Sequence, residues 1–567
     1  MIAKKQVFNP YLPSFEYVPD GEPHVFDGRV YLYGSHDRFD GAEFCLNDYV
    51  SWSAPVDDLT DWRYEGVILK KEQDPRNQNI PENVKEPKPC FGVPVRRKNS
   101  LNKAGIHAQW APDVTKGKDG RYYLYYCLDY LPEIAVAVCD QPAGEYSFLG
   151  FVKHADGTAL GSAEGDFLQF DPGIFMDDDG TIYLYSGNAP MRREEMDNPG
   201  SEKQGSQVMV LEDDMLTLRK EPTRLMPDIR NSEGTEYEGH EFFEASSIRH
   251  INGKYYFIYS SVRSHELCYA VSDRPDRDFE FCGTLVDIGD VFLNGRTDQE
   301  AVMALGNTHG GIECCNGQWY VFYHRQTNRT LFSRQACAEK IFLKDDGRFE
   351  QAEVTSCGLN KNALSGEGIY PARICCHLTR YGKNVMSNPM LFLMDYPFLT
   401  QDCDDLIPTA ENIEADEKLP VQYVANMRDE SAVGFKYFEF DGNKKDILLK
   451  IRECSYQPGK EITKEQLEAY AWMQNQDFSE LDLKKTELDM KKKLDVTCLP
   501  HPKGEILVST VPYPEPDKIC GCLPVDKLSE DWTELSGSIQ VPEGTQPLYF
   551  TYRGQGSIDF CQINIMK

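Results

Sequence analysis

One pattern of hydrophobic and polar positions recurs through the first 330 residues. A polar turn containing Asp-Gly or Asn-Gly separates two apolar runs, and the second run is rich in tyrosine. It occurs in VFDGRVYLYGSHD (25–37), TKGKDGRYYLYYCLD (115–129), FMDDDGTIYLYSG (175–187), RHINGKYYFIYSS (249–261) and ECCNGQWYVFYHR (313–325). Asp-Gly and Asn-Gly favour two-residue hairpins, because a type I′ turn needs positive φ at both central positions. The pattern predicts five hairpins of one kind.

The spacing of these hairpins indicates a repeat architecture. The turn glycines are at positions 28, 120, 180, 253 and 317. Intervals of roughly sixty to ninety residues suit one four-stranded antiparallel sheet with its loops, and the first interval carries insertions. A β-sandwich also repeats hairpins, but it would not readily repeat the same tyrosine-rich strand five times. The prediction is an all-β chain that begins with a five-bladed β-propeller.

Charged side chains recur at one position of this repeat. Asp20, Asp171 and Glu244 each precede a turn glycine by eight or nine residues, His309 does so in the fifth repeat, and Trp110 starts the matching WAPD segment of the second. In a propeller the first strand of each hairpin is innermost, so these positions should line one mouth of the central channel. An isolated carboxylate there would usually be a solvated turn residue. Three at one repeat position indicate a site.

Hydrolysis of a glycosidic bond is typically catalysed by two carboxyl groups that face each other across the pocket. One protonates the leaving oxygen and the other activates a water or attacks directly. A third nearby carboxylate can raise the pKa of the acid by repulsion.

With these motifs in place, the sequence resembles glycoside hydrolase family 43, five-bladed propeller enzymes that act on xylosides and arabinosides. The motifs cover about residues 8–350 and are NPYLPSFEYVPDGEPHVF at the start, WAPDV (110–114), FDPGIFMDDDG (170–180), FFEASSIRHINGKYY (242–256), and HGGI with YHR (309–325). The resemblance implies hydrolysis with inversion of configuration. The base and acid are then expected about 6.5–9.5 Å apart, leaving space for a water.

The resemblance also implies roles for the three carboxylates. Asp20 looks like the general base, Asp171 like the carboxylate that tunes the pKa of the acid and orients it, and Glu244 like the general acid. Glu22 competes for the base position, because Asp20-Gly-Glu22-Pro replaces the usual Asp-Pro of the family. Rivals of Glu244 that lack its offset from the turn are Glu236, Glu238 and Glu241.

Four further residues follow from the resemblance. Trp110 resembles an aromatic wall of the pocket, His36 in GSHD is placed there too, and Arg325 in YHR resembles an arginine that contacts the sugar. His309 resembles the channel histidine that often coordinates a central Ca²⁺ through water, which leaves a calcium ion open; no organic cofactor is expected. The run Asp177–Asp179 before Gly180 lacks the spaced oxygens of an EF-hand loop and is interpreted as a turn.

Composition narrows the partners and the compartment. The net charge of −31 disfavours nonspecific binding to nucleic acid or anionic membranes. The 18 cysteines are scattered through strand-like runs without C-x-x-C spacing, which favours reduced core thiols. No apolar signal segment is visible at the start, and no stretch is long enough to span a membrane. A cytoplasmic location, a small oligosaccharide substrate and no nucleic-acid or membrane partner are expected, with a homo-oligomer left open.

The pattern changes after the propeller. The predicted domains are a catalytic propeller at 1–350, a connector at 351–394 and a β-sandwich at 395–567. The sandwich rests on apolar strands such as AVGFKYFEF (432–440) and on a closing segment, WTELSGSIQVPEGTQPLYFTYRGQGSIDF, similar to family 6 carbohydrate-binding modules. A helical insertion is expected at about 460–497, which is charged and free of proline and glycine after its start.

The predicted function is an inverting exo-glycosidase that removes terminal β-D-xylosyl or α-L-arabinofuranosyl residues from short plant-cell-wall oligosaccharides. Two alternatives stay open: a glycan-binding propeller that has lost catalysis, and a glycosidase acting on another furanoside. All three carboxylates are present, which favours an enzyme.

Overall fold

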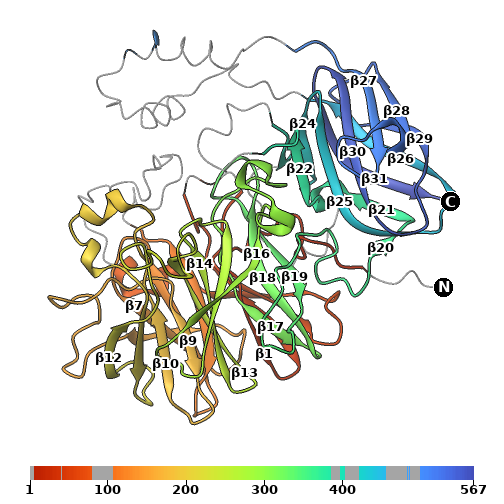
Figure 1. The fold of residues 1–567 in the computed structure, drawn as a ribbon. Coiled ribbons are helices and arrows are strands. Elements are labelled where there is room, and N and C mark those ends of the chain that lie inside the picture. The colour runs from red at the N-terminus through yellow and green to blue at the C-terminus, as the bar shows by residue number, and fades with distance from the viewer. Residues whose placement is uncertain are drawn as a thin grey trace.

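A computed structural model describes residues 6–39, 41, 43–78, 106–384, 396–402, 420–454, 482, 484–485 and 499–567. The chain forms two β-rich domains (Figure 1), an N-terminal propeller and a C-terminal sandwich that lies beside blade five. The five-bladed all-β fold predicted from the hairpin repeats is confirmed.

The propeller consists of five antiparallel sheets in chain order. Blade one is β1 (Glu22–Phe26), β2 (Arg29–Tyr33), β3 (Tyr49–Pro55) and β4 (Arg63–Leu69). Blade two is β5 (Gln109–Lys116), β6 (Tyr122–Leu128), β7 (Ile134–Cys139) and β8 (Ser147–Phe151). Blade three is β9 (Gly173–Met176), β10 (Ile182–Ser186), β11 (Gln207–Leu211) and β12 (Leu218–Arg224). Blade four is β13 (Phe242–Ile251), β14 (Lys254–Ser261), β15 (Glu266–Ser272) and β16 (Glu280–Asp287). Blade five is β17 (Ile312–Cys315), β18 (Gln318–Gln326) and β19 (Arg334–Ile341).

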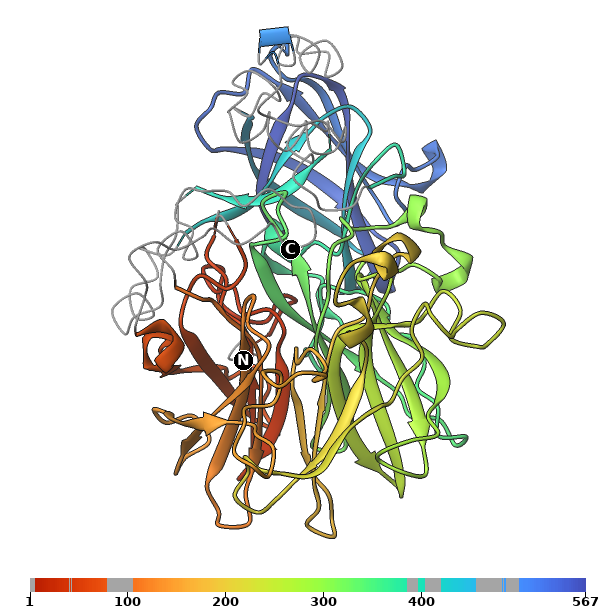
Figure 2. The same cartoon turned by 90° about the vertical axis from the view of Figure 1, so that its left-hand side faces the viewer.

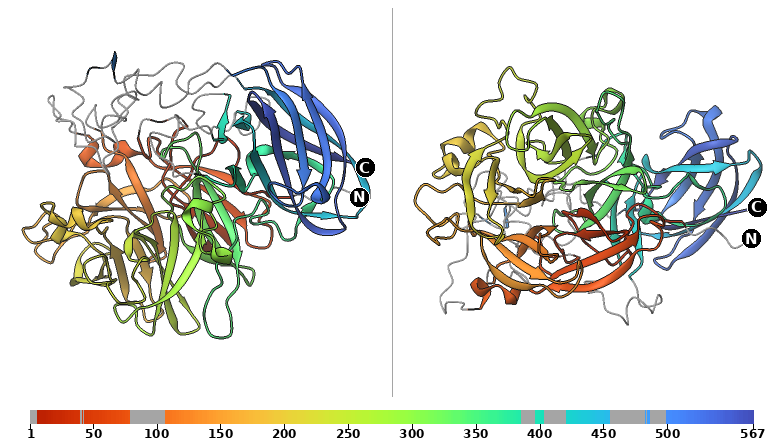
Figure 3. Two further views of the ribbon diagram at one scale, coloured as in Figure 1. Left: turned by 45° about the horizontal axis from the view of Figure 1, so that its top comes forward. Right: turned by 90° about the horizontal axis from the view of Figure 1, so that it is seen from below.

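The first strand of each blade is innermost, as the repeat predicts. Strand β1 lies against β5 and β17, and β9 lies against β5 and β13, so the inner strands follow one another around the axis. Figure 3 (right) shows the five sheets arranged around this centre. A parallel bridge between Gly21 and Gly310 joins blades one and five. The N-terminal segment closes the ring, since Asn9 donates to Glu339 Oε1 (2.7 Å) and accepts from the Ala338 amide.

The tyrosine-rich strands are the second strands of the blades, and their alternation fills the gaps between blades. Successive side chains of a strand point to opposite faces. In blade one, Val30 and Leu32 therefore pack toward blade five, while Tyr31 and Tyr33 pack toward blade two. The Tyr33 hydroxyl reaches the edge of this core and donates to the Pro142 carbonyl at 2.7 Å. Tyrosine suits the position because its ring is buried while its hydroxyl still finds an acceptor.

The five turns follow two geometries. In blades one, four and five both central residues have positive φ, as in Asp27-Gly28 (48° and 78°), which is the predicted type I′ arrangement. In blades two and three only the glycines, Gly120 and Gly180, have positive φ. There the Gly120 amide donates to the Gly117 carbonyl, which makes a longer loop ending in a left-handed glycine. The type I′ prediction is therefore wrong for these two blades, although the hairpins are present.

The C-terminal domain is two six-stranded sheets packed face to face. The first sheet contains β20 (Leu364–Ser365), β22 (His377–Arg380), β25 (Ser431–Phe440), β27 (Lys503–Ser509), β28 (Ile519–Asp526) and β30 (Gly544–Gln555). The second contains β21 (Gly368–Pro371), β23 (Phe398–Gln401), β24 (Gln422–Met427), β26 (Lys444–Glu453), β29 (Thr533–Gln540) and β31 (Ile558–Met566). One hydrophobic core, with Phe435, Phe550 and Phe560 near its middle, joins both sheets.

The predicted connector (351–394) and the predicted insertion (about 460–497) can be compared with the structure to different extents. Strands β20 to β22 fall within 351–394, so that stretch pairs with the sandwich as well as connecting to it. The insertion expected at about 460–497 lies outside the described residues except for 482, 484 and 485. Elsewhere the described helices are short 3-10 turns: η1 (Lys71–Gln73), η2 (Pro75–Asn77), η5 (Arg193–Asp197), η6 (Ser201–Lys203), η7 (Leu293–Gly295), η8 (Asp298–Glu300), η9 (Ala372–Ile374) and η13 (Pro516–Lys518). Over the described ranges, none of the helices has the length and apolarity required to cross a bilayer.

The two domains share buried polar contacts. Lys436 of β25 reaches back to the propeller, with its Nζ 3.1 Å from Asp290 Oδ2. Tyr17 of the propeller lies between two sandwich side chains, donating to Gln401 Oε1 at 2.8 Å and accepting from Gln422 Nε2 at 2.7 Å. Figure 2 shows the sandwich seated on the propeller. Buried polar pairs of this kind fix the relative position of two domains more strictly than apolar contact alone.

Candidate active site

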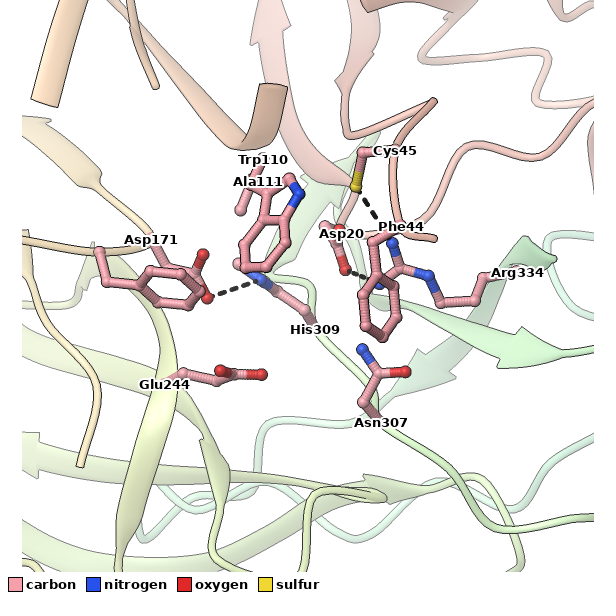
Figure 4. A pocket seen from close by; sticks show the side chains of 11 residues that line it. Asp20, Phe44, Cys45, Trp110, Ala111, Asp171, Glu244, Asn307, His309 and Arg334 are labelled. Atoms are coloured by element: carbon pink, nitrogen blue, oxygen red, sulfur yellow. Dashed lines mark hydrogen bonds and ion pairs between the residues drawn. The ribbon is translucent and has the colours of Figure 1, made fainter. Parts of the chain in front are cut away.

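A pocket of about 360 Å³ opens at one mouth of the propeller channel. Its lining comes from all five blades and comprises Asp20, Phe44, Cys45, Trp110, Ala111, Phe170, Asp171, Glu244, Asn307, His309 and Arg334. Five of the residues singled out from the sequence meet here, namely the three carboxylates, Trp110 and His309. In Figure 4, Asp171 and Glu244 lie on one side of the pocket and Asp20 lies with Arg334 on the other.

The backbone is left-handed at the same place in four blades. The residues are Asp20 (φ 55°), Ala111 (37°), Asp171 (44°) and Ala245 (70°). Positive φ costs a non-glycine residue of order 1 kcal/mol or more and persists only where the surroundings enforce it. In β13 the strand register shifts on both sides of Glu244, and in β5 it shifts between Trp110 and Asp113. Such bulges re-aim side chains, and here they turn Glu244 and Trp110 toward the channel mouth.

Asp20 is held by a buried arginine. Arg334, the first residue of β19, places Nη1 2.9 Å from Asp20 Oδ1, while its Nε lies 2.8 Å from Asp37 Oδ2. Burial raises the pKa of Asp20, but the positive charge of Arg334 outweighs it and leaves the pKa below its usual value. Asp20 is therefore ionised across the neutral range, as a general base must be.

Glu244 and Asp171 have the opposite tendency. Burial, and then repulsion from Asp20, raise the pKa of Glu244 to about 8. Burial, and then repulsion from Glu244 and Asp20, raise the pKa of Asp171 well above its usual value. Two buried carboxyls this close do not both ionise easily, so this pair keeps a proton near neutral pH. The site thus combines the ionised carboxylate of Asp20 with a second group, the pair of Glu244 and Asp171, that keeps a proton. This combination suits a reaction that needs both a general base and a general acid.

His309 lies at the centre of the pocket, with Nδ1 3.5 Å from Asp171 Oδ2. Burial lowers its pKa, so the ring is neutral at neutral pH and has the form that ligates a metal. Deeper in the channel, Glu22, His24 and Asp113 bring possible ligand atoms together. Each carboxylate already has a close partner: Arg249 Nη2 lies 2.7 Å from Glu22 Oε1, and His24 Nε2 lies 2.6 Å from Asp113 Oδ1.

Three aromatic rings, those of Phe44, Trp110 and Phe170, form part of the pocket lining. Trp110 packs edge-on against Phe44 (5.9 Å between centroids) and Phe170 (5.5 Å). Phe44 in turn stacks on the guanidinium of Arg334 at 4.7 Å. An apolar wall facing a few polar groups is typical of small-molecule pockets, and here it matches the apolar face of a sugar ring.

Two predicted substrate-binding residues lie outside the pocket lining. His36 is buried, with Nε2 2.8 Å from Glu16 Oε1 and Nδ1 2.8 Å from the Asp48 carbonyl. Arg325 donates through Nη1 to the Cys375 carbonyl at 2.6 Å and through Nη2 to the Arg373 carbonyl, so it binds the segment leading into the sandwich. In each case the adjacent residue, Asp37 or His324, contacts the site instead.

The rivals of the predicted acid and base have other partners. Glu22 accepts from Ser247 and Arg249 within the channel. Glu241 accepts from Ser232 Oγ at 2.8 Å, and Glu238 from the Gly234 amide. Residues that sequence reasoning missed are Arg334, Phe44, Phe170 and Asn307, which come from loops or from the third strand of a blade. Only Arg334 carries a signal, as an arginine that opens an otherwise mostly buried strand.

A five-bladed propeller with an ionised and a protonated carboxyl facing one pocket defines a glycoside hydrolase. The family model for glycosyl hydrolases family 43 matches residues 90–349. The chain is 43% identical over 557 residues to a xylosidase/arabinosidase from Thermoclostridium stercorarium, covering 98% of each chain. It is 30% identical over 338 residues to a β-xylosidase from Xylanibacter ruminicola, covering 55% of this chain and 89% of that one. The protein belongs to glycoside hydrolase family 43.

Among solved structures, an arabinoxylan arabinofuranohydrolase of the same family from Bacillus subtilis, in complex with cellotetraose, aligns with 98% of this chain and 96% of its own. The TM-score is 0.43 at 18% identity.

Proposed function

We propose that this glycoside hydrolase removes terminal β-D-xylosyl and α-L-arabinofuranosyl residues from short oligosaccharides, with inversion of configuration. The observation that carries the proposal is the pocket itself. Three blades each send one carboxylate to it, and their pKa values are shifted in opposite directions. A relative covering nearly the whole chain is named xylosidase/arabinosidase, which supports both sugars.

In the proposed reaction Asp20 is the general base and Glu244 the general acid. Asp20, ionised beside Arg334, takes a proton from the attacking water. Glu244 gives its proton to the glycosidic oxygen as the bond to the anomeric carbon breaks. The water oxygen becomes the new anomeric hydroxyl on the opposite face, which is inversion. In the same proposal Asp171 orients Glu244, and repulsion between the two carboxyls raises the pKa of Asp171 itself.

A calcium ion at the channel centre belongs to the same proposal. His309 is neutral, and the carboxylates around it supply the oxygen environment that Ca²⁺ prefers, so the residues present fit an ion held through water. Bound there, it would add positive charge beneath the pocket. Metal analysis of protein purified without added salt tests this, with loss of thermal stability on chelation as the second readout.

The cytoplasmic location is also proposed. The described cysteines are all free thiols, and most are buried, among them Cys127, Cys268 and Cys375. Reduced, buried thiols suit a reducing compartment. Fractionation of the native organism with an antibody to the chain tests it, because enzyme found only in the medium would contradict the proposal.

The testing experiment follows xylobiose hydrolysis by NMR and records the first-formed anomer. Inversion predicts α-xylose before mutarotation. Asp20→Asn and Glu244→Gln should each lower kcat by about 10²–10⁴-fold. Asp178→Asn is the matched control, since its carboxylate is at the exposed hairpin tip and should leave turnover intact.

The outcomes separate the alternatives. Full turnover in both pocket variants would refute the residue assignment, and a β-anomer product would refute inversion. No turnover on a wide panel of pentosides and other furanosides, with glycan binding retained, would instead favour a binding propeller.

A further inference from the structure

His324 lies directly behind Asp20, on the neighbouring blade. It is in β18 and has no exposed surface. Its Nδ1 accepts the backbone amide of Asp20 at 3.1 Å, and the same nitrogen is 3.4 Å from Asp20 Oδ1. The backbone of Asp20 is left-handed, with a φ of 55°. The imidazole therefore hydrogen-bonds to the backbone at a strained residue.

The contact has counterparts at other blade boundaries. Ser35, which follows β2 of blade one, accepts the amide of left-handed Ala111 in blade two at 2.8 Å. Cys127 in β6 of blade two receives a hydrogen bond from the backbone of left-handed Asp171 in blade three. In each case a side chain near the end of the second strand of one blade supports the strained residue of the next blade. At the Asp20 boundary this side chain is an imidazole.

The direction of this hydrogen bond fixes the tautomer. Because Nδ1 accepts a hydrogen bond from the Asp20 amide, the proton of the neutral ring must be on Nε2. Nε2 has no side-chain or backbone partner that meets hydrogen-bond geometry within the described residues, and the backbone of Asn307 lies beside the ring. Burial lowers the pKa of His324 to about 3, with Arg334 and His309 acting in the same direction against Asp20, so the ring is neutral.

We propose that His324 is a positioning residue for the general base. As a neutral acceptor it holds the Asp20 backbone in the left-handed conformation, so that the carboxylate stays against Arg334 and faces the water. The inference rests on the proposed role of Asp20. It predicts that the reaction depends on an acceptor at the Nδ1 position and not on the charge of the ring.

Two substitutions separate the acceptor from the bulk of the ring. In His324→Asn the amide oxygen can occupy the place of Nδ1 and accept the Asp20 amide. In His324→Gln the terminal amide reaches the place of Nε2, and the Asp20 amide loses its acceptor. We expect His324→Asn to retain kcat within about tenfold, and His324→Gln to lose about 10²-fold with little change in KM.

Stability should separate the two variants less than kcat does. Asparagine leaves the larger cavity, while glutamine leaves the buried Asp20 amide without an acceptor, so the two losses of Tm offset each other. A purely structural role would make kcat follow Tm, and that result would overturn the proposal, as would equal kcat in the two variants. Asp20→Asn is measured alongside: if it keeps full turnover, the proposed role of Asp20 fails instead.

A measurement on the unmodified enzyme covers the case in which neither variant folds. The bond to Nδ1 predicts that the Asp20 amide exchanges with deuterium as slowly as the amides of β18. Exchange within the fast phase of the exposed loops would overturn the proposal.

Discussion

Arg334 Nη1 lies 2.9 Å from Asp20 Oδ1, in a buried ion pair that joins the third strand of blade five to the segment just before the first strand of blade one. The same guanidinium binds Asp37 through Nε at 2.8 Å. One cation is thus shared by two buried carboxylates, and it sets both the charge and the direction of Asp20. The planar fork of arginine permits this, whereas a lysine would satisfy one carboxylate at a time.

Replacement of Arg334 by lysine should therefore impair the base without removing the charge. We expect Arg334→Lys to lower kcat by about 10- to 100-fold, because the carboxylate of Asp20 is no longer held at a fixed angle. KM for xylobiose should change less. Arg325→Lys is the control, since that arginine binds backbone carbonyls away from the pocket. Equal losses of kcat in the two variants would contradict the assignment.

The opposite pKa shifts predict a broad, bell-shaped pH profile. The acid limb of kcat/KM belongs to Asp20 and should lie below the usual aspartate pKa of about 3.9, because Arg334 favours the ionised form. The basic limb belongs to the pair of Glu244 and Asp171, with Glu244 titrating near pH 8. Activity should fall below the first pKa, where the base is protonated, and above the second, where the acid is ionised.

Steady-state kinetics between pH 3.5 and 9.5 check this profile. In Arg334→Lys the acid limb should move upward, since the carboxylate loses part of its stabilisation. A basic limb that stays unchanged in Glu244→Gln, in whatever activity remains, would show that another group supplies the proton.

Glu244 should also lower the stability of the folded protein at neutral and basic pH. The pKa of Glu244 is raised in the folded protein, to about 8, so its favourable contribution is complete below its unfolded pKa of about 4.3. That contribution is lost as pH rises from there through pH 8. Glu244→Gln cannot ionise and avoids the loss, so its Tm relative to wild type should increase over this window and then level off. The gain is on the order of 1–3 kcal/mol. A constant difference in Tm between pH 4 and 9 would contradict the raised pKa.

The propeller could be predicted from the sequence because one hairpin pattern, a turn glycine followed by a tyrosine-rich strand, occurs five times. Each hairpin is encoded within about a dozen residues, and the fixed offset between carboxylate and turn glycine carried Asp20, Asp171 and Glu244 to one channel mouth. The acidic run at 177–179 is a hairpin tip, as expected: the Gly180 amide donates to the Asp177 carbonyl, and Asp178 is exposed.

His36 and Arg325 lie outside the pocket lining for a common reason. His36 and Arg325 each stand next to the residue that faces the site, Asp37 and His324. A shift of one residue in extended backbone turns a side chain to the opposite side. The repeat does not set this parity near the end of the second strand, where the blades differ: β18 still contains Arg325, whereas β2 ends before His36. Arg334 lies beyond the hairpin, and its partners come from blade one, so only closure of the ring brings them together.

The contact between the domains gives a prediction independent of catalysis. Lys436 of the sandwich is buried, with Nζ 3.1 Å from Asp290 Oδ2 of the propeller and 2.9 Å from Glu353 Oε1. Lys436→Met leaves the buried Asp290 carboxylate with only the more distant Arg296, whose Nη1 is 3.9 Å from Oδ2, and should cost about 3–5 kcal/mol. Asp290→Asn removes the charge but keeps an oxygen for the Val354 amide, which donates to Asp290 Oδ1 at 2.7 Å.

The double variant of Lys436 and Asp290 should therefore be less destabilised than the sum of the single ones, with a coupling energy of about 1–3 kcal/mol from urea unfolding. Additivity within about 0.5 kcal/mol would mean that the ion pair does not link the domains. Xylobiose turnover in all three variants, measured below their unfolding transitions, should stay near wild type, because neither residue lines the pocket.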